Sequence, residues 1–338
     1  MKINALLLFL TLVFTFSASA EDFMPSTIFQ LDKKFTHHVI VVEKATHTLF
    51  LYQYDNQVPK LIKKYQIATG KKIGNKLIQG DKRTPEGIYF FQKFHSADNL
   101  IEKYGKTGLI YGAGAFTLNY PNVMDRRNGK TGGGIWLHST DDDARVSKGL
   151  DSRGCVVAID SDLKDISQYI DLENTPAIIV QNLNFITKET WLKNRDDVSD
   201  VITKWSQAWT NKDFDNYISS YSTKEFFSSS RGGFRAYKNY KRRVFSRKDK
   251  PVIDFRNISI LHNGDYVIAT MEQDYYSPII KDIGKKTLYL KKNEHYEWKI
   301  IHESFQKLDA NRNLAFTPSM RFFSENRKEE IANDSESI

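Results

Sequence analysis

Residues 39–70 read VIVVEKATHTLFLYQYDNQVPKLIKKYQIATG, and this stretch decides the fold of the first half of the chain. Its apolar and β-branched residues fall into three short runs. A short polar turn separates the first two runs, and Asp55-Asn56 separates the second from the third. Runs of this kind between turn residues predict three strands that pair as an antiparallel meander.

The pattern continues in the same way to about residue 183. In GDKRTPEGIYFF (80–91), Pro85-Glu86-Gly87 predicts a turn into a further strand. GIWLHST (134–140) and PAIIV (176–180) read as two more strands, with a helix expected around 161–171. Residues 35–183 are therefore predicted to form a mainly β, β-sandwich-like domain with few helices.

The pattern changes near residue 190. In residues 198–222, Val198, Ile202, Trp205 and Trp209 lie at helical spacing, and Asp213 is placed to cap a second helix. Trp205 and Trp209 are either core residues or a platform for a sugar. Four alternating stretches follow and predict strands at 252–260, 265–276, 285–292 and 296–304. We therefore expect an α+β domain at 197–308, after a linker at 184–196 and before a polar, disordered tail at 309–338.

The first twenty residues have the features of a secretory signal. Met1-Lys2 precedes an apolar run from Ala5 to about Phe16, which is too short to span a bilayer, and Ala18-Ser19-Ala20 resembles a cleavage site. We expect a signal peptide at 1–20, cleavage before Glu21, an N-terminal arm at 21–34 and no later membrane span. The mature protein would then work outside the cytoplasm.

The chain is basic, with a formal net charge of +8 at pH 7. A basic exported protein favours an acidic partner such as a cell-wall polymer, an anionic lipid or a polysaccharide, and export argues against nucleic acid. KNYKRRVFSRKDK (238–250) is the most basic stretch. It reads either as a solvated helix face or as a patch for an anionic glycan.

Cys155 is the only cysteine of the chain, in LDSRGCVVAID (150–160). It lies where a Ser-Arg-Gly turn enters a strand, so its side chain is either a buried core thiol or a nucleophile presented to a cleft. A nucleophilic thiol needs a base, and His138, 17 residues upstream at the end of another predicted strand, is the candidate. Backbone amides near Gly154 and Cys155 would then stabilise an oxyanion.

These residues resemble the L,D-transpeptidase (YkuD-type) catalytic domain. HST (138–140) followed by SRGCV (152–156) is similar to that family's His and Ser-His/Arg-Gly-Cys signature, and GDKRTPEGIYFF resembles its Thr-Pro-x-Gly strand. LNYPN (118–122) fits the branch that acts in Gram-negative cell walls. Residues 197–308 resemble a nuclear transport factor 2-like domain. The pairing of the two is similar to the cell-shape L,D-carboxypeptidases of curved and helical bacteria.

The resemblance implies a mechanism and a set of site residues. Cys155 would attack the carbonyl at the L-centre of the third residue of a peptidoglycan stem and expel terminal D-alanine, with His138 moving the proton. Ser139 would support the imidazole through its backbone carbonyl, at a position where many relatives have Gly. Arg153 either holds a substrate carboxylate, lies solvated in its turn or clamps the loop through Asp151. Tyr120, in the LNYPN motif, is a further candidate for substrate binding.

Two classes of function remain open from the sequence. The first is a peptidoglycan-modifying enzyme, most simply an L,D-carboxypeptidase that trims tetrapeptide stems to tripeptides in the periplasm and affects cell shape. Its variant is an L,D-transpeptidase that forms 3–3 crosslinks or attaches and detaches wall-linked protein. The second is a non-catalytic protein that binds the wall or a partner. No cofactor or metal is predicted, the C-terminal domain would take a glycan or protein ligand, and the oligomeric state, a homodimer included, stays open.

Overall fold

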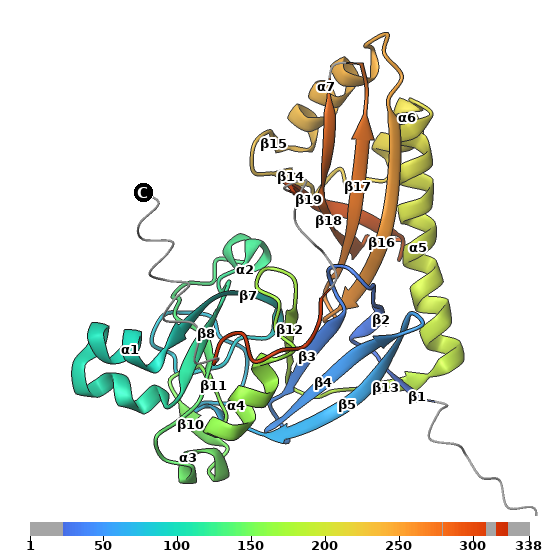
Figure 1. The fold of residues 1–338 in the computed structure, drawn as a ribbon. Helices are drawn as coiled ribbons and strands as arrows, with labels where there is room; N and C mark the ends of the chain where they lie inside the picture. The colour runs from blue at the N-terminus through green and yellow to red at the C-terminus, as the bar shows by residue number, and fades with distance from the viewer. Residues whose placement is uncertain (1–22, 279, 309–315, 324–338) are drawn as a thin grey trace, which may run out of the picture.

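The computed structural model describes residues 23–278, 280–308 and 316–323, which form two domains (Figure 1). The predicted signal peptide at 1–20 lies outside the described residues, as do residues 309–315 and 324–338 of the predicted tail. Within the described ranges, no helix combines the length and the apolar character needed to cross a membrane.

An eight-stranded mixed sheet forms the N-terminal domain. Its strands in spatial order are β11 (Val156–Val157), β9 (Trp136–His138), β8 (Gly114–Leu118), β7 (Gly87–Ser96), β12 (Pro176–Val180), β3 (His38–Glu43), β4 (Thr48–Asp55) and β5 (Val58–Gln66). Strands β3, β4 and β5 form the predicted antiparallel meander. Asn56 and Gln57 make the turn between β4 and β5 with φ of 51° and 70°, the left-handed conformations that a two-residue hairpin turn needs.

Short elements surround this sheet. Strands β6 (Thr69–Gly70) and β10 (Leu150–Ser152) form a small parallel pair. The helices are α1 (Ala97–Tyr104), the 3₁₀ helix η2 (Gly105–Tyr111), α2 (Val123–Arg127), α3 (Ala144–Ser147) and α4 (Asp160–Ser167), the last at the position where the sequence predicts a helix. The described residues therefore confirm a mainly β domain with few helices.

The C-terminal domain packs three helices on a five-stranded antiparallel sheet. The helices are α5 (Lys188–Thr210), α6 (Phe214–Ser219) and α7 (Phe234–Phe245), and β14 (Phe227–Ser228) pairs with β15 (Gly232–Gly233) between α6 and α7. The sheet runs in the order β19 (Trp298–Lys307), β18 (Lys281–Lys292), β17 (Val267–Tyr276), β16 (Val252–His262) and β2 (Ile28–Gln30). The predicted α+β class is confirmed, and the Asp213 carboxylate caps α6 by accepting a hydrogen bond from the Asn216 N–H at 3.1 Å.

Burial on both faces of β3 joins the two domains. Side chains alternate between the faces of a strand. Ile40 and Val42 accordingly belong to the core of the N-terminal domain, whereas Val39 and Val41 belong to a cluster that includes Ile268 of the C-terminal sheet. This second cluster is a continuous apolar contact between the domains.

The structure corrects two predicted boundaries. The predicted arm at 21–34 contains β1 (Phe23–Pro25), which pairs with β13 (Phe185–Thr187), and β2, which adds an edge strand to the C-terminal sheet. The predicted linker at 184–196 is β13 and the start of α5. Both segments are ordered because they contribute to the core. Trp191, in the predicted linker, is buried, and its indole N–H donates to the Ile28 carbonyl of β2 at 2.7 Å.

Part of the predicted tail is also ordered, which corrects the prediction of disorder for residues 316–323. Phe322 inserts into the N-terminal core, with its ring 5.1 Å from that of Phe94 and 4.9 Å from that of Phe116. Arg321 donates to the Ile170 carbonyl at 3.2 Å. The chain thus returns from the C-terminal domain to close the core of the first domain.

We expect Phe322→Ala to lower the free energy of unfolding by about 3 kcal/mol, because it removes a buried aromatic ring and leaves a cavity. The measurement is urea unfolding followed by circular dichroism. Met320→Ala is the matched control, since Met320 is 39% exposed in the same segment whereas Phe322 is 8% exposed. Equal effects of the two substitutions would contradict a specific role for the Phe322 contact.

Candidate active site

Parallel pairing of β11 with β9 brings Cys155 and His138 to one face of the sheet. Val157 is the register partner of His138, and Val156 is the partner of Leu137. Cys155 lies two residues before Val157, so its side chain points to the same face as that of His138. Cys155 is half-buried and His138 is buried.

Gly154 shapes the turn that presents the thiol. Its φ of 130° lies in the region that favours glycine, and a Cβ there would lie 2.8 Å from the Arg83 carbonyl oxygen. The Gly154 N–H donates to the Ser152 hydroxyl at 3.0 Å, and this hydroxyl donates to the Cys155 carbonyl at 2.6 Å. The Gly154 amide is therefore already used, which corrects its predicted part in an oxyanion pocket. The Cys155 N–H has no partner among the described residues.

Ser139 fixes the orientation of the catalytic imidazole candidate. The Nδ1 atom of His138 lies 2.5 Å from the Ser139 carbonyl oxygen. A carbonyl only accepts hydrogen bonds, so Nδ1 carries the proton and Nε2 of the neutral ring keeps its lone pair. His138 is therefore held in the tautomer that a general base requires.

Burial keeps both members of the pair neutral. It lowers the pKa of His138 to about 4, an effect that the hydrogen bond to Ser139 only partly opposes. It also raises the pKa of the Cys155 thiol to about 11, against the lowering effect of a hydrogen bond from the Trp136 backbone. The thiol donates to the Gly134 carbonyl at 3.5 Å. The resting site thus holds a neutral thiol and a neutral imidazole, with Tyr111 as a common neighbour.

Tyr111 is a site residue that sequence reasoning missed. Its ring lies 5.0 Å from the His138 ring, edge to face, and 5.0 Å from the Trp136 ring. The Ser139 hydroxyl donates to the Tyr111 carbonyl at 3.1 Å and accepts from the Ala113 N–H at 2.8 Å, so it ties this segment to the end of β9. A tyrosine between glycines carries no sequence signal for this contact, which depends on the fold.

Gly112 allows this close approach. Its φ is 53°, and a Cβ at this position would lie 2.6 Å from the Ser139 Oγ and 2.4 Å from the Asp160 Oδ1. The Ala113 N–H, which donates to the Ser139 hydroxyl, also donates to this Asp160 oxygen at 2.9 Å. The segment that carries Tyr111 is therefore fixed from both β9 and α4.

A half-buried ion pair supports the loop between His138 and Cys155. The Arg145 Nε donates to Asp151 Oδ2 at 2.7 Å, and its guanidinium also donates to the Thr140 hydroxyl. The interpretation of Arg153 as a clamp to Asp151 is therefore wrong, because Asp151 pairs with Arg145. Arg153 is exposed and makes no ion pair within the described residues.

Tyr120 has a structural contact in this protein. It is buried, and its hydroxyl donates to the Thr131 carbonyl at 3.2 Å. That bond leaves Tyr120 as a residue that holds the 120–131 loop rather than one that offers a hydroxyl to a ligand. The described residues contain no group of three His, Cys, Asp or Glu side chains placed to hold a metal ion.

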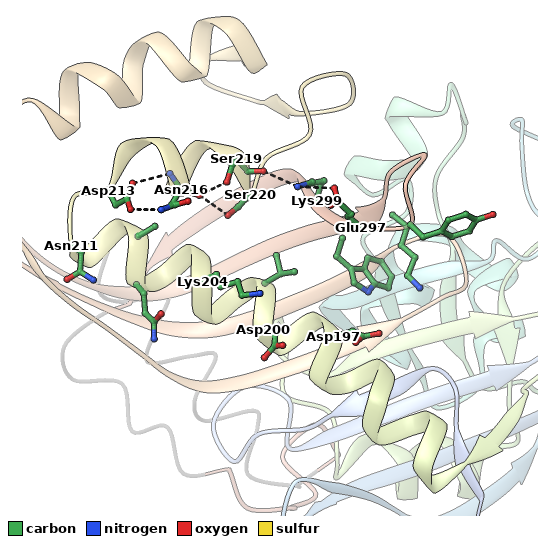
Figure 2. A pocket seen from close by; sticks show the side chains of 16 residues that line it. Asp197, Asp200, Lys204, Asn211, Asp213, Asn216, Ser219, Ser220, Glu297 and Lys299 are labelled. Atoms are coloured by element: carbon green, nitrogen blue, oxygen red, sulfur yellow. Dashed lines mark hydrogen bonds and ion pairs between the residues drawn. The ribbon is translucent and has the colours of Figure 1, made fainter.

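A separate groove of about 770 Å³ lies in the C-terminal domain (Figure 2). It runs between α5, α6 and the β18–β19 turn, and all of its lining residues belong to this domain. Its walls carry carboxylates, amides, hydroxyls and lysines, together with Trp298 and the exposed Tyr296. Such a lining suits a polar ligand rather than an apolar one.

The interior of the C-terminal domain holds a buried polar cluster. Trp205 is a core residue, as one of its two interpretations has it, and its indole N–H donates to the Tyr221 hydroxyl at 2.9 Å. Lys286 pairs with Glu303 at 2.7 Å. Lys241, from the basic stretch, is buried with its ammonium 4.4 Å from the centre of the Trp209 ring. The stretch is therefore not solvated along its whole length.

Comparisons with known proteins agree with this architecture. Residues 37–179 match the model of the L,D-transpeptidase catalytic domain (YkuD), and residues 197–304 match that of the Cds6 C-terminal NTF2-like domain. The structure of Bdellovibrio bacteriovorus Bd1075 is 31% identical, with a TM-score of 0.74 over 86% of this chain and 100% of that one. The helical cell shape determining protein Pgp2 from Campylobacter jejuni is 26% identical, with a TM-score of 0.65 over 82% of this chain and 94% of that one. No curated protein matched the chain.

The fold and the site define an acyl-transfer enzyme of the L,D-transpeptidase type. The chain belongs to the L,D-transpeptidase (YkuD) family, in a form that carries a C-terminal nuclear transport factor 2-like domain. The resemblance predicted from HST, SRGCV and GDKRTPEGIYFF is therefore confirmed.

We expect the rate of Cys155 alkylation by iodoacetamide to rise with pH up to about 11, because the thiolate is the reacting form and burial raises the pKa of this thiol. The measurement is the initial rate of labelling at a series of pH values, read by mass spectrometry. Protein unfolded in urea is the control, and its rate should level off above the ordinary thiol pKa of about 8.5. A native midpoint below pH 8 would contradict the neutral pair.

Proposed function

We propose that the protein is a peptidoglycan L,D-carboxypeptidase that uses Cys155 as nucleophile and His138 as base. The observation that carries the proposal is the placement of both side chains on one face of β9 and β11, with the Ser139 carbonyl holding Nδ1 of His138. This arrangement leaves Nε2 available to accept the thiol proton. The family membership of the chain supports the same chemistry.

The reaction proceeds in two acyl-transfer steps. The Cys155 sulfur attacks the carbonyl carbon at the L-centre of the third stem residue while its proton passes to Nε2 of His138. The C–N bond to D-alanine then breaks, and His138 returns the proton to the leaving amine. Water attacks the thioester, again with His138 as base, and releases the tripeptide stem together with the regenerated thiol.

Because the Cys155 thiol and the His138 imidazole are both neutral at rest, the main energy barrier falls on the attack of the sulfur on the carbonyl. Because burial lowers the pKa of His138 and raises that of Cys155, proton transfer must accompany formation of the C–S bond rather than precede it. The developing oxyanion needs a donor, and the unpartnered Cys155 N–H is the candidate. The neutral state of His138 above pH 4 makes the base available across the working range.

Arg153 is proposed to hold a carboxylate of the stem peptide. Its exposure beside the thiol and its lack of an ion pair within the described residues support this role. A guanidinium binds a carboxylate through two parallel hydrogen bonds, which would fix the stem relative to the sulfur.

Water is the proposed acceptor because of the domain architecture. The C-terminal domain links the chain to Pgp2, a helical cell shape determining protein, and trimming of stems is the activity that we infer from this likeness. The groove of Figure 2 is the proposed site for a glycan or protein ligand, and its polar lining and exposed Tyr296 support it. Formation of 3–3 crosslinks remains the alternative, since a stem amine can replace water at the thioester.

Export to the periplasm completes the proposal. Its support is the apolar run and Ala-Ser-Ala sequence within the first twenty residues, together with the location of a peptidoglycan substrate.

We expect Cys155→Ala to reduce turnover of muropeptides by several orders of magnitude while the protein stays folded, because it removes the nucleophile of a coupled pair. The measurement is product release followed by chromatography, with near-ultraviolet circular dichroism as the check of folding. Residual activity within tenfold of the parent in a folded variant would overturn the assignment and would favour a binding protein.

We expect free tripeptide to be the main product when the enzyme acts on an excess of tetrapeptide monomers. A transpeptidase must position an amine well enough to compete with water at about 55 M, which requires a second bound stem. The measurement separates the muropeptides by chromatography and identifies them by mass. A larger yield of 3–3 crosslinked dimers than of tripeptide would reverse the order of the two activities and leave the thioester chemistry in place.

A further inference from the structure

The positive charge of this protein is concentrated in one short segment. Residues 231–250 contain nine Lys and Arg residues and one acidic residue, Asp249, so their net charge equals the +8 of the whole chain. The other 318 residues contain 40 basic and 40 acidic residues and are neutral in sum. The charge is therefore a local feature and not a general property of the surface.

This segment forms one end of the C-terminal domain. It begins at the β14–β15 turn, runs through α7 and ends just before β16, and the end of α7 and the start of β16 lie at the end of the domain that points away from the N-terminal domain (Figure 1). The 12 residues of β18 span about 40 Å, which is the approximate distance between the two ends of the sheet. Val252, Tyr276 and Lys281, at the tip of the sheet, lie beyond the contacts that Lys285 of β18 and Phe227 of β14 make with the N-terminal domain.

Three of the five basic side chains on α7 face solvent. Arg235, Arg242 and Arg243 are exposed and, with Asn239, lie at helical spacing on one face, whereas Tyr237 and Lys241 are buried on the other. Within the described residues, none of the nine basic side chains of 231–250 forms an ion pair. Clustered exposed charges of one sign without ion-pair partners are characteristic of a surface that meets an anionic partner.

Exposed apolar residues lie at the same end. Val252 and Tyr276 are direct partners across β16 and β17, so their side chains share a face, and they are 66% and 56% exposed. Ile280, in the turn that follows β17, is 38% exposed. The basic segment is adjacent to them, because Arg247, Pro251 and Tyr275 line one small pocket.

We infer that this end of the C-terminal domain, the basic pole formed by α7, residues 246–251 and the tip residues Val252, Tyr276 and Ile280, docks on an anionic phospholipid membrane. Lysine and arginine bind the headgroups while exposed apolar and tyrosine side chains enter the boundary with the acyl chains. Hydrated wall polymer offers the charges but little apolar volume, so the tip residues favour lipid over peptidoglycan as the partner.

Docking of this kind would orient the enzyme. In Figure 1 the N-terminal domain lies on the side of the C-terminal domain opposite the α7 tip, so docking through the basic pole would leave the N-terminal domain directed away from the membrane, toward the wall. The inference does not depend on the proposed acyl-transfer reaction.

The test is co-sedimentation of the chain from Glu21 onward with vesicles. Binding is expected to vesicles of phosphatidylethanolamine and phosphatidylglycerol, to fall steeply with added salt, and to be absent with phosphatidylcholine alone. The variant Arg235→Ala/Arg243→Ala/Lys248→Ala removes three exposed charges that make no side-chain contact within the described residues. We expect its partition coefficient to fall roughly 100-fold, at about fivefold for each charge.

Two further variants make the test specific. Lys64→Ala/Lys103→Ala/Lys106→Ala removes the same charge from exposed positions on the N-terminal domain and should bind as the parent does. Val252→Ser/Tyr276→Ser should weaken binding without changing its dependence on salt. Equal losses of vesicle binding in the triple variant of the basic pole and in the triple variant of the N-terminal domain would show a general charge effect and overturn the proposal.

The alternative partner is tested in parallel with purified insoluble peptidoglycan. Retention on peptidoglycan that depends on Arg235, Arg243 and Lys248, with no binding to anionic vesicles, would also overturn the proposal and assign the basic pole to the wall. Turnover of soluble muropeptides is measured on the same samples, so a failure of the docking surface is distinguished from a failure of the acyl-transfer assignment.

Discussion

The parallel pairing of β11 with β9 is the constraint on which the chemistry of this protein depends. Each strand is only two or three residues long, yet their register, together with the turn that enters β11, places Cys155 on the face occupied by His138. A shift of one residue would turn the thiol to the opposite face. Gly154 and Ser152 hold the entering turn, and Ser139 holds the imidazole, so short strands are sufficient because hydrogen bonds fix both ends of the pair.

A second constraint explains why the two domains behave as one body in this structure. The central strand β3 has apolar side chains on both faces, and one set of them packs on the C-terminal sheet. Segments that cross between domains strengthen this contact. Strand β2 joins the C-terminal sheet from the N-terminal side, and residues 316–323 return to the first domain. The basic pole is consequently fixed in direction relative to Cys155, which an articulated linker would not achieve.

The sequence predicts those features that arise from local patterns. The meander at 39–70, the cap at Asp213 and the pair of His138 and Cys155 depend on residue types at short spacing or on a family motif. The features that it misses are contacts between distant segments. The three residues of β2 contain no pattern that predicts their pairing with β16, about 230 residues away. The hydrogen bond from the Ser139 hydroxyl to the Tyr111 carbonyl likewise becomes evident only in the folded structure. Lys241 looks like part of a solvated run, but its ammonium is buried against Trp209 because the helix face turns inward there.

The neutral resting pair bears on the single thiol of this chain. In the proposed periplasmic location, a cysteine without a disulfide partner would meet oxidants, which react mainly with thiolate. Burial that raises the pKa of Cys155 and a hydrogen bond to the Gly134 carbonyl keep this thiol protonated at rest. The same burial lowers the pKa of His138, so the base is never lost to protonation above pH 4. It also makes the free energy of unfolding decrease as the pH is lowered from about 6.5 to 4, because in this range the histidine is protonated in the unfolded chain and neutral in the folded chain. In the proposed mechanism, reactivity is thus withheld until a bound carbonyl lets the sulfur form its bond as the proton leaves, which links protection of the thiol to selectivity for the substrate.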